Sequence, residues 1–267
     1  MQISFSMMEY MSIATLVTGT CWLIVRTRKS VDGKKGGVAW LIKSCAELFG
    51  VIALVLFCRV ALADWQHVPS GSMEPTLRVG DRILVNKLAY GPRLPFTNTA
   101  IKLGQPERGD VVVFRYPGNV SEFYVKRLVG LPNDLVTYSR GVVRINDQPF
   151  DVKVDSAVVP KAEDRGQIFV DETAGNQKRI IKLNVAMPGE RITPIAWMER
   201  YAKNCVVISS QDWQCKVPEG KYLMMGDNRD NSVDSRVWGF LDEYEVYGKV
   251  TKVIFNLSDM RRSWMSL

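Results

Sequence analysis

Two long apolar runs in the first quarter of the chain constrain its fold more than any other feature. The first extends from about Met7 to Val25 and the second from about Val38 to Ala63. Either run can cross a bilayer, which needs ~20 residues of helix. A cleaved signal peptide would carry its positive charges ahead of the apolar run, whereas here they follow it. We therefore predict two transmembrane helices, at residues 1–25 and 38–63.

The charges between the two runs predict the orientation of these helices. Residues 26–37 form a short loop with five cations: Arg26, Arg28, Lys29, Lys34 and Lys35. Short loops rich in Lys and Arg stay in the cytoplasm. The second helix then leads outward, so everything from about Asp64 onward lies outside the cytoplasmic membrane. We expect a multi-pass protein of the inner (plasma) membrane, in contact with membrane lipid, with its larger part on the periplasmic, extracytoplasmic side.

After Leu77 the chain changes to short runs of β-branched and aromatic residues, separated by Gly, Pro, Asn and Asp. The runs occupy residues 82–88, 111–116, 123–129, 135–138, 142–145, 179–185, 221–225 and 249–255. This texture predicts a mainly-β unit. Residues 156–220 are less patterned and richer in charge. We assign residues 64–155 and 221–267 to the main β domain and residues 156–220 to a β-rich insertion or subdomain.

The excess of positive charge does not indicate nucleic-acid binding. The 267 residues include 35 Lys and Arg against 28 Asp and Glu, which gives a net charge of +7. Part of this excess is the basic loop, and no arginine-rich helix or basic–aromatic stripe occurs elsewhere. We therefore expect no nucleic-acid partner.

Histidine and cysteine usage argues against a metal centre. His67 is the only histidine and no C-x-x-C spacing occurs, so zinc lacks its usual ligands. We expect neither a metal nor a cofactor. Cys205 and Cys215 flank a short polar segment, and they can form a loop disulfide if that part of the chain is extracytoplasmic.

The segment after the second apolar run presents two hydroxyls one glycine apart, in Ser70-Gly71-Ser72. Ser, Gly and Pro are common in turns, so a plain polar turn is one interpretation. The other is a nucleophile, which needs a base to remove the hydroxyl proton. His67 lies only five positions before Ser72, and the G-x-S-x-G elbow of many serine hydrolases is missing. A conventional Ser-His-Asp site is therefore disfavoured.

Lysine is the remaining common base, and Lys126 is the candidate. A lysine must be neutral to act, so burial has to lower its pKa from ~10.4. The alternation of a strand places Lys126 on one face with Tyr124 and Leu128, which is an unusual position for a charge. The alternative is an edge-strand lysine that discourages aggregation.

A third polar stretch extends from Gly226 to Arg236. Residues 230–234 begin like a calcium loop, but Ser235 replaces the required glycine and Leu241 replaces the bidentate acid. Two interpretations stay open: a solvated turn, or a buried network of Asp and Arg that orders a site.

Together these stretches resemble the bacterial type I signal peptidases (leader peptidases, peptidase family S26). Four motifs occur in the family's order after two apolar runs: Ser70-Gly71-Ser72-Met73-x-Pro75-Thr76-Leu77, Arg108-Gly109-Asp110-Val111-Val112-Val113-Phe114, Tyr124-Val125-Lys126-Arg127-Leu128-Val129-Gly130, and Gly226 to Arg236 followed by Gly239. The resemblance is concentrated in residues 61–134 and 221–255, and residues 156–220 match no known motif. The departures are small: Asn133 stands where glycine is common and Glu74 fills a variable position.

The resemblance implies a membrane-bound serine endopeptidase whose catalytic domain is the mainly-β unit. Its substrates would be exported preproteins, from which it cleaves N-terminal signal peptides after small residues. Ser72 would be the nucleophile and Lys126 the general base. The Ser70 hydroxyl and the Ser72 backbone N–H would stabilise the oxyanion, and Ser232 would hydrogen-bond and orient the lysine.

The same resemblance assigns supporting roles. Asp234 and Arg236 would hold their loop in place. Four residues would line the shallow pockets for small substrate side chains: Val68, Pro69, Tyr124 and Val125. The alternatives are a peptidase of the same type specialised for one pilin or conjugation substrate, and a non-catalytic membrane-anchored assembly protein. A Ser-Lys autoprotease joined to a DNA-binding domain is disfavoured because two apolar runs precede the serine.

Overall fold

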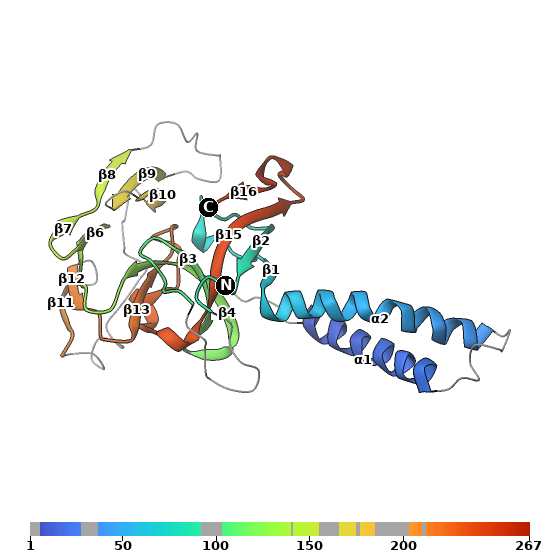
Figure 1. Cartoon of the computed structure of the whole chain (residues 1–267). Helices are drawn as coiled ribbons and strands as arrows, with labels where there is room; N and C mark the ends of the chain where they lie inside the picture. Colours follow the sequence, from blue (N-terminus) through green and yellow to red (C-terminus); the bar gives the residue numbers. More distant parts are fainter. Residues whose placement is uncertain are drawn as a thin grey trace. The chain divides into compact units, whose positions relative to one another are not determined.

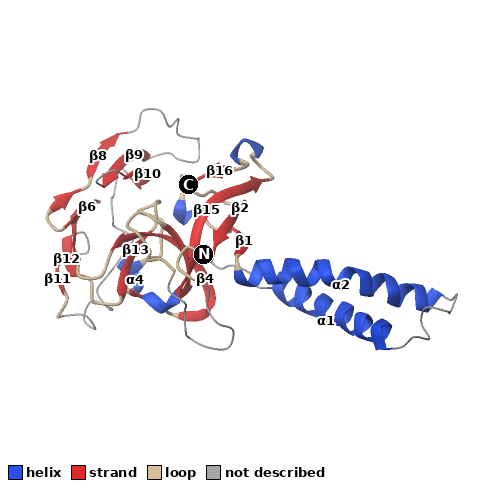
Figure 2. Ribbon diagram, in the orientation of Figure 1, coloured by secondary structure: helices blue, strands red, loops and turns tan. Residues whose placement is uncertain are grey.

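The structure is a computed structural model, and it describes residues 6–27, 37–91, 103–139, 141–154, 166–174, 177–184, 203–209 and 212–267. The chain divides into two units, Ser4–Asp64 and Trp65–Leu267. The first contains two helices and the second consists mainly of strands (Figures 1 and 2). The predicted mainly-β texture after the apolar runs is therefore confirmed.

The N-terminal unit is a pair of packed helices, α1 (Ser6–Thr27) and α2 (Gly37–Ala61). Gly19 of α1 lies against Phe49 of α2, where an added Cβ would come within 3.1 Å of the ring. The Trp22 and Phe49 rings lie 5.6 Å apart. Both apolar runs are thus confirmed as helices. The second ends at Ala61, because the chain turns there into a strand. The predicted loop lies largely outside the described residues.

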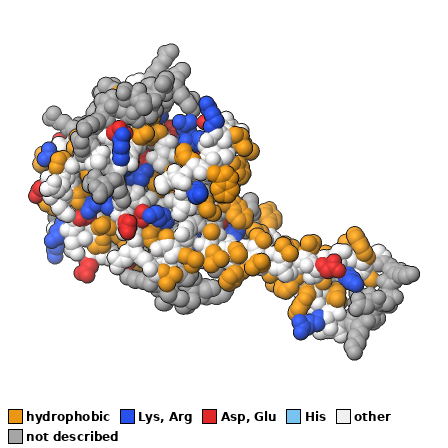
Figure 3. Space-filling view, turned by 45° about the horizontal axis from the view of Figure 1, so that its top comes forward, with side chains coloured by type: hydrophobic (Ala, Val, Ile, Leu, Met, Phe, Trp, Pro, Cys, Tyr) orange, Lys and Arg blue, Asp and Glu red, His pale blue; other side chains and the backbone are white. Residues whose placement is uncertain are grey.

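Only one described helix, over Gly37–Arg59, is both long and apolar enough to cross a membrane. Its apolar side chains face outward, as Figure 3 illustrates for the helical unit. Helix α1 is more polar, with threonines whose hydroxyls donate to carbonyls of the preceding turn, such as Thr15 Oγ1 to Met11 O at 2.8 Å. We predicted two membrane-spanning helices, and among the described helices one has the required apolarity.

The largest sheet of the second unit has eight strands in the order β1-β2-β15-β3-β4-β13-β14, with β16 paired to β15. The strands are β1 (Ala63–His67), β2 (Asp81–Asn86), β3 (Val111–Tyr116), β4 (Asn119–Gly130), β13 (Lys221–Met225), β14 (Leu241–Asp242), β15 (Val246–Asn256) and β16 (Met265–Ser266). Strands β3 and β4 belong to two of the sequence motifs, and they pair directly with each other. This pairing places the lysine strand in the middle of the sheet.

Two smaller sheets complete the unit, a five-stranded one in the order β11-β12-β5-β6-β7 and a three-stranded one in the order β10-β9-β8. Their strands are β5 (Leu135–Ser139), β6 (Val142–Ile145), β7 (Gln148–Pro149), β8 (Asp151–Val154), β9 (Gln167–Ala174), β10 (Gln177–Asn184), β11 (Cys205–Ser209) and β12 (Asp212–Lys216). Strand β12, from the segment assigned to an insertion, pairs with β5 of the main domain. Cys205 and Cys215 face each other across β11 and β12 and form a disulfide.

Short helical turns connect the strands: η2 (Gly71–Met73), α4 (Ser235–Trp238), η4 (Glu243–Glu245) and η5 (Met260–Arg262). One apolar core is formed by side chains of the eight-stranded and five-stranded sheets. It includes Tyr138 and Trp213, whose rings stack 5.4 Å apart, together with Leu223 and Met225 of β13. Strand β13 is thus anchored by its buried side chains immediately before the polar stretch that begins at Gly226.

Candidate active site

Ser72 lies in the single turn η2, a short distance along the chain from β1. Its side chain is almost fully buried, and so is that of Met73. The turn is tight, because Glu74 N donates to Gly71 O and Leu77 N donates to Met73 O. A solvated polar turn is therefore the wrong interpretation of this segment: the structure directs the Ser72 hydroxyl into the protein.

Lys126 comes from the middle of β4, between β3 and β13. The edge-strand alternative is therefore wrong. The side chain is 1% exposed, and Nζ donates a hydrogen bond to Ser72 Oγ at 2.6 Å. Two residues separated by 54 positions thus meet in one buried contact.

The environment of Lys126 shifts its protonation equilibrium toward the neutral amine. Burial lowers its pKa most, and Arg236 lowers it further, while Asp234 and Asp227 raise it; the result is a pKa of about 8. With that pKa, roughly a tenth of the side chains are neutral at pH 7. The hydroxyl of Ser72 then faces an amine that is able to accept its proton.

The loop after β13 lies directly against the backbone of the serine turn. Asn228 N donates to Ser72 O at 3.2 Å, and Asn228 Nδ2 donates to Gly71 O at 3.0 Å. Gly226 must be a glycine here, since an added Cβ would lie 2.5 Å from Ser72 O and 2.2 Å from Ser232 Oγ. This close approach of two backbones fixes the position of the Ser72 carbonyl.

Two buried ion pairs hold this loop. Arg236 bonds both oxygens of Asp234, Nε to Oδ1 at 2.9 Å and Nη2 to Oδ2 at 2.8 Å, and Gly226 N donates to the same carboxylate. Arg127 likewise bonds both oxygens of Asp227, at 2.7 and 2.6 Å. The buried network is the correct interpretation of this stretch, and the solvated turn is wrong.

The carboxylates of this network are ionised despite their burial. Burial favours the protonated form of Asp234, but Arg236 and the Gly226 N–H outweigh it, so the pKa lies below its usual value. The pKa of Asp227 is also lowered, since Arg127 and the Thr76 hydroxyl outweigh burial. Both groups therefore stabilise the fold above their unfolded pKa of ~4, and that contribution is lost as the pH falls through the folded values.

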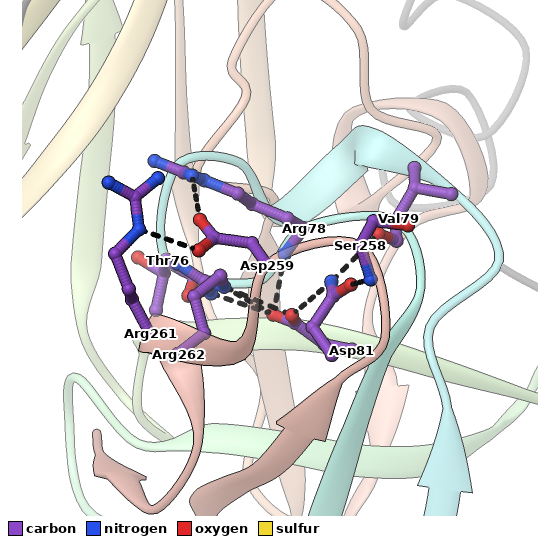
Figure 4. Close-up of polar contacts among 9 residues, drawn as sticks. Thr76, Arg78, Val79, Asp81, Ser258, Asp259, Arg261 and Arg262 are labelled. Carbon is purple, nitrogen blue, oxygen red and sulfur yellow. Dashed lines mark hydrogen bonds and ion pairs between the residues drawn. The ribbon is translucent and has the colours of Figure 1, made fainter.

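A second polar network fixes the chain that follows Ser72, and local sequence patterns do not predict it. Arg262 Nη2 donates to Asp81 Oδ2 at 2.7 Å and to Thr76 O at 2.8 Å. Asn256 Nδ2 donates to Asp81 Oδ1 at 2.8 Å and to Val79 O at 3.1 Å. Figure 4 shows Arg262 directed at Asp81, which is fully buried. Asp81 and Arg262 are 181 positions apart, so no local sequence motif contains both.

The other predicted site residues are placed as follows. Ser232 is buried, but its hydroxyl has no hydrogen-bond partner among the described residues, so the expected bond to Lys126 is not formed. Ser70 is half-buried at the start of η2 and its side chain caps nothing. Tyr124 is partly buried and stacks on Tyr116 at 4.3 Å.

Val68 and Val125 are fully buried, whereas Pro69 is exposed. The burial of these residues does not test whether they line substrate pockets, so that assignment stays a prediction. Among the described residues, no group of three His, Cys, Asp or Glu side chains is arranged to hold a metal ion.

A serine hydroxyl hydrogen-bonded to a buried lysine amine is the kind of pair that nucleophilic catalysis uses, with one group as nucleophile and the other as base. The comparison with protein families agrees: the model "Signal peptidase, peptidase S26" matches residues 41–255. The chain belongs to this family of serine peptidases.

Individual relatives support the assignment. Signal peptidase I of Buchnera aphidicola (subsp. Baizongia pistaciae) is 30% identical over 293 residues, covering 96% of this chain and 94% of that protein. Signal peptidase I of Pseudomonas aeruginosa is 36% identical over 236 residues, covering 84% of this chain and 75% of that protein. A crystal structure of a signal peptidase I from Enterococcus faecalis, at 25% identity, covers 56% of this chain and all of that one with a TM-score of 0.32, too low to compare sites.

The buried pair of Asp234 and Arg236 predicts a large effect on stability. Replacing Arg236 by Met leaves a carboxylate buried without its partner, and we expect the free energy of unfolding to fall by about 3–5 kcal/mol. Denaturant unfolding of the full chain in detergent measures this. Arg261→Met is the matched control, because Arg261 is paired with Asp259 at 3.0 Å but is 92% exposed. We expect little or no change from it, and equal effects of the two substitutions would contradict the role given to the buried pair.

Proposed function

We propose that this protein cleaves N-terminal signal peptides from exported preproteins after small residues, with Ser72 as nucleophile and Lys126 as general base. The 2.6 Å contact between Ser72 Oγ and Lys126 Nζ, inside a buried environment, is the observation that carries the proposal. The signal peptidase relatives supply the substrate class. Catalysis needs both residues, since a hydroxyl is a weak nucleophile without a base.

In the first half of the reaction the neutral Lys126 amine accepts the Ser72 proton while Oγ attacks the scissile carbonyl carbon. The peptide C–N bond then breaks, and the lysine ammonium returns the proton to the leaving amine. In the second half the same amine takes a proton from water as the water oxygen attacks the acyl carbonyl carbon. The ester C–O bond then breaks, and the lysine ammonium returns the proton to Ser72 Oγ. Each half begins and ends with a neutral lysine, so the proton balance closes.

The developing oxyanion requires hydrogen-bond donors. We assign the Ser72 backbone N–H and the Ser70 hydroxyl to this role, and loss of one such donor costs on the order of 3 kcal/mol of transition-state stabilisation. Ser70 precedes the nucleophile by two positions in the same turn, and its hydroxyl is not used as a helix cap. Ser232 would orient Lys126 once its buried hydroxyl rotates toward the amine.

We assign the substrate pockets to Val68, Pro69, Tyr124 and Val125. Two of these side chains are already closely packed, Val68 and Val125 being fully buried. Tyr124 is partly buried and Pro69 is exposed, so these two side chains have surface that a substrate can reach.

We further propose that residues 1–25 and 38–63 are transmembrane helices joined by a cytoplasmic loop at residues 26–37. The catalytic domain, residues 64–155 and 221–267 with the insertion at 156–220, would then face the periplasm, with lipid as a partner and no nucleic acid. Ser72 follows the end of α2 at Ala61 by eleven positions (72 − 61). A short tether keeps the nucleophile near the membrane surface, where a signal peptide emerges.

The dyad predicts a total loss of processing when either member is removed. We expect Ser72→Ala and Lys126→Ala each to lower kcat on a preprotein substrate by at least about a thousandfold, with thermal unfolding unchanged in cooperativity. Two control substitutions remove the same groups from exposed positions, Ser121→Ala and Lys178→Ala. They should retain activity. Retained cleavage by Lys126→Ala would rule out the dyad.

The lowered pKa of Lys126 predicts the pH dependence. Only the neutral amine acts, so kcat/KM should rise about tenfold per unit below pH ~8 and level off above it. A steady-state profile between pH 6 and 10 measures this. A profile that is flat over the range, or that falls with pH, would contradict the assignment of the base.

The proposed topology predicts which part of the chain is open to a protease outside the cell. In intact spheroplasts, added protease should digest the region after Asp64 and leave the residue 26–37 loop protected. A cysteine introduced into that loop should react with an impermeant thiol reagent only after lysis. The opposite pattern would reverse the orientation.

A further inference from the structure

The hairpin of β9 and β10 lies in the segment that matches no motif, yet it contacts the loop that supports Ser72. Lys182 N donates to Asp227 O at 2.9 Å, and Arg229 N donates to Lys182 O at 3.0 Å. These bonds form a parallel bridge between Lys182 and Asn228. Two residues further along each segment, Asn184 N donates to Asp230 Oδ2 at 2.6 Å. The hairpin thus adds a strand-like edge to this loop.

Three buried charged side chains, Glu172, Arg179 and Arg229, also connect the hairpin to the loop after β13. Glu172 of β9 is fully buried and receives Arg229 Nη2 at 2.5 Å and Arg179 Nε at 2.6 Å. Arg179 comes from β10, so the carboxylate links both strands of the hairpin to the loop. Burial opposes ionisation of Glu172, but the two guanidinium groups outweigh it and lower its pKa. The cluster is therefore charged at neutral pH.

Stability alone is a weak explanation for such a cluster. Taking three charges out of water costs several kcal/mol per ion, and the mutual attraction only roughly compensates. In addition, Glu172 Oε1 and Nη1 of both arginines have no hydrogen-bond partner in the described part of the chain. What the cluster does provide is a defined position for Arg229, because its Nη2 and the Nε of Arg179 both bond Glu172 Oε2.

Asn228 connects the position of Arg229 to the turn that contains Ser72. Asn228 precedes Arg229 and makes both hydrogen bonds to the serine turn, to Ser72 O and Gly71 O. On the other side of Asn228, Asp227 bonds Arg127, the neighbour of the catalytic lysine in β4. A shift of the loop would therefore move the Ser72 backbone relative to β4.

We propose that Glu172, with Arg179 and Arg229, is a positioning residue: the buried cluster holds the loop against the Ser72 carbonyl and keeps water away from the Ser72–Lys126 contact. This inference rests on the dyad mechanism proposed above. It gives the otherwise unmatched hairpin a function in catalysis, at a distance from the reacting atoms and through named contacts.

The consequence for Lys126 can be measured. The charged and polar groups that face it are Ser72, Asp234, Arg236, Asp227 and the ring of Tyr124, which lies 5.8 Å from Nζ. A loosened loop admits water to this contact. Because burial is the largest cause of the lowered pKa, solvent entry must raise it.

The test is Glu172→Gln in the full-length protein, assayed for preprotein cleavage between pH 6 and 10. We expect kcat at pH 7 to fall roughly tenfold with KM within about twofold, and the midpoint of the pH profile to rise by about half a unit or more. Loss of a negative charge would by itself lower the pKa of a nearby lysine. A rise therefore reports solvent entry and not a direct charge effect.

Asp171→Asn is the matched control. Asp171 is the neighbour of Glu172 in β9 and pairs with Lys178 at 2.7 Å on the outside of the hairpin, where Lys178 is 66% exposed. The Asp171→Asn substitution removes one carboxylate from the same strand and should leave kcat, KM and the midpoint of the pH profile unchanged. Glu172→Asp, which keeps the charge but shortens the side chain, should show a smaller rise of the same sign. Arg179→Lys provides the same comparison should neither Glu172 variant fold.

Two results would overturn the inference. One is a folded variant with the kinetics of the control; the other is a rate reduced equally at every pH with an unmoved midpoint, which is the signature of a smaller folded fraction. Failure of the dyad mechanism looks different, since Ser72→Ala would then still cleave. Running Ser72→Ala in the same assay keeps the two failures apart.

Discussion

Burial of one amine against one hydroxyl is the interaction on which the rest of this structure depends. Lys126 is placed where water cannot solvate its charge, and the same packing that excludes water brings Ser72 Oγ to 2.6 Å. A surface lysine would be a cation at neutral pH and could not accept a proton. The sheet therefore has two tasks: to hide Lys126 and to hold the serine turn against it.

The second task needs support from parts of the chain that are far apart in sequence. The turn receives Asn228 on one side, and the segment after it receives Arg262 through Asp81 and Thr76. Each support is itself fixed by buried ion pairs, which have strict geometry and little net stabilising value. Several buried charges thus lie around the Ser72 turn, where they fix the orientation of the segments that contact it.

Much of this site could be predicted because its signals are local. Alternation along one strand singled out Lys126, and the chain lacked a well-placed histidine; the structure brings Lys126 to Ser72 from an interior strand. Partners such as Glu172 and Arg229, separated by 57 positions, left no local signal. Helix α1 was expected to be a membrane span from its length and apolar residues, but its threonines make it less apolar than α2, and among the described helices only α2 has the required apolarity.

The link from Arg262 back to the nucleophile segment also sets an order of events during synthesis. Residue 262 follows residue 72 by 190 positions (262 − 72), and ribosomes add roughly 5–20 residues per second. About 10–40 s therefore pass before the serine turn can acquire its last support. During that interval the Ser72 segment lacks one of the contacts that hold it, so assembly of the site has to wait for residues that are synthesised much later.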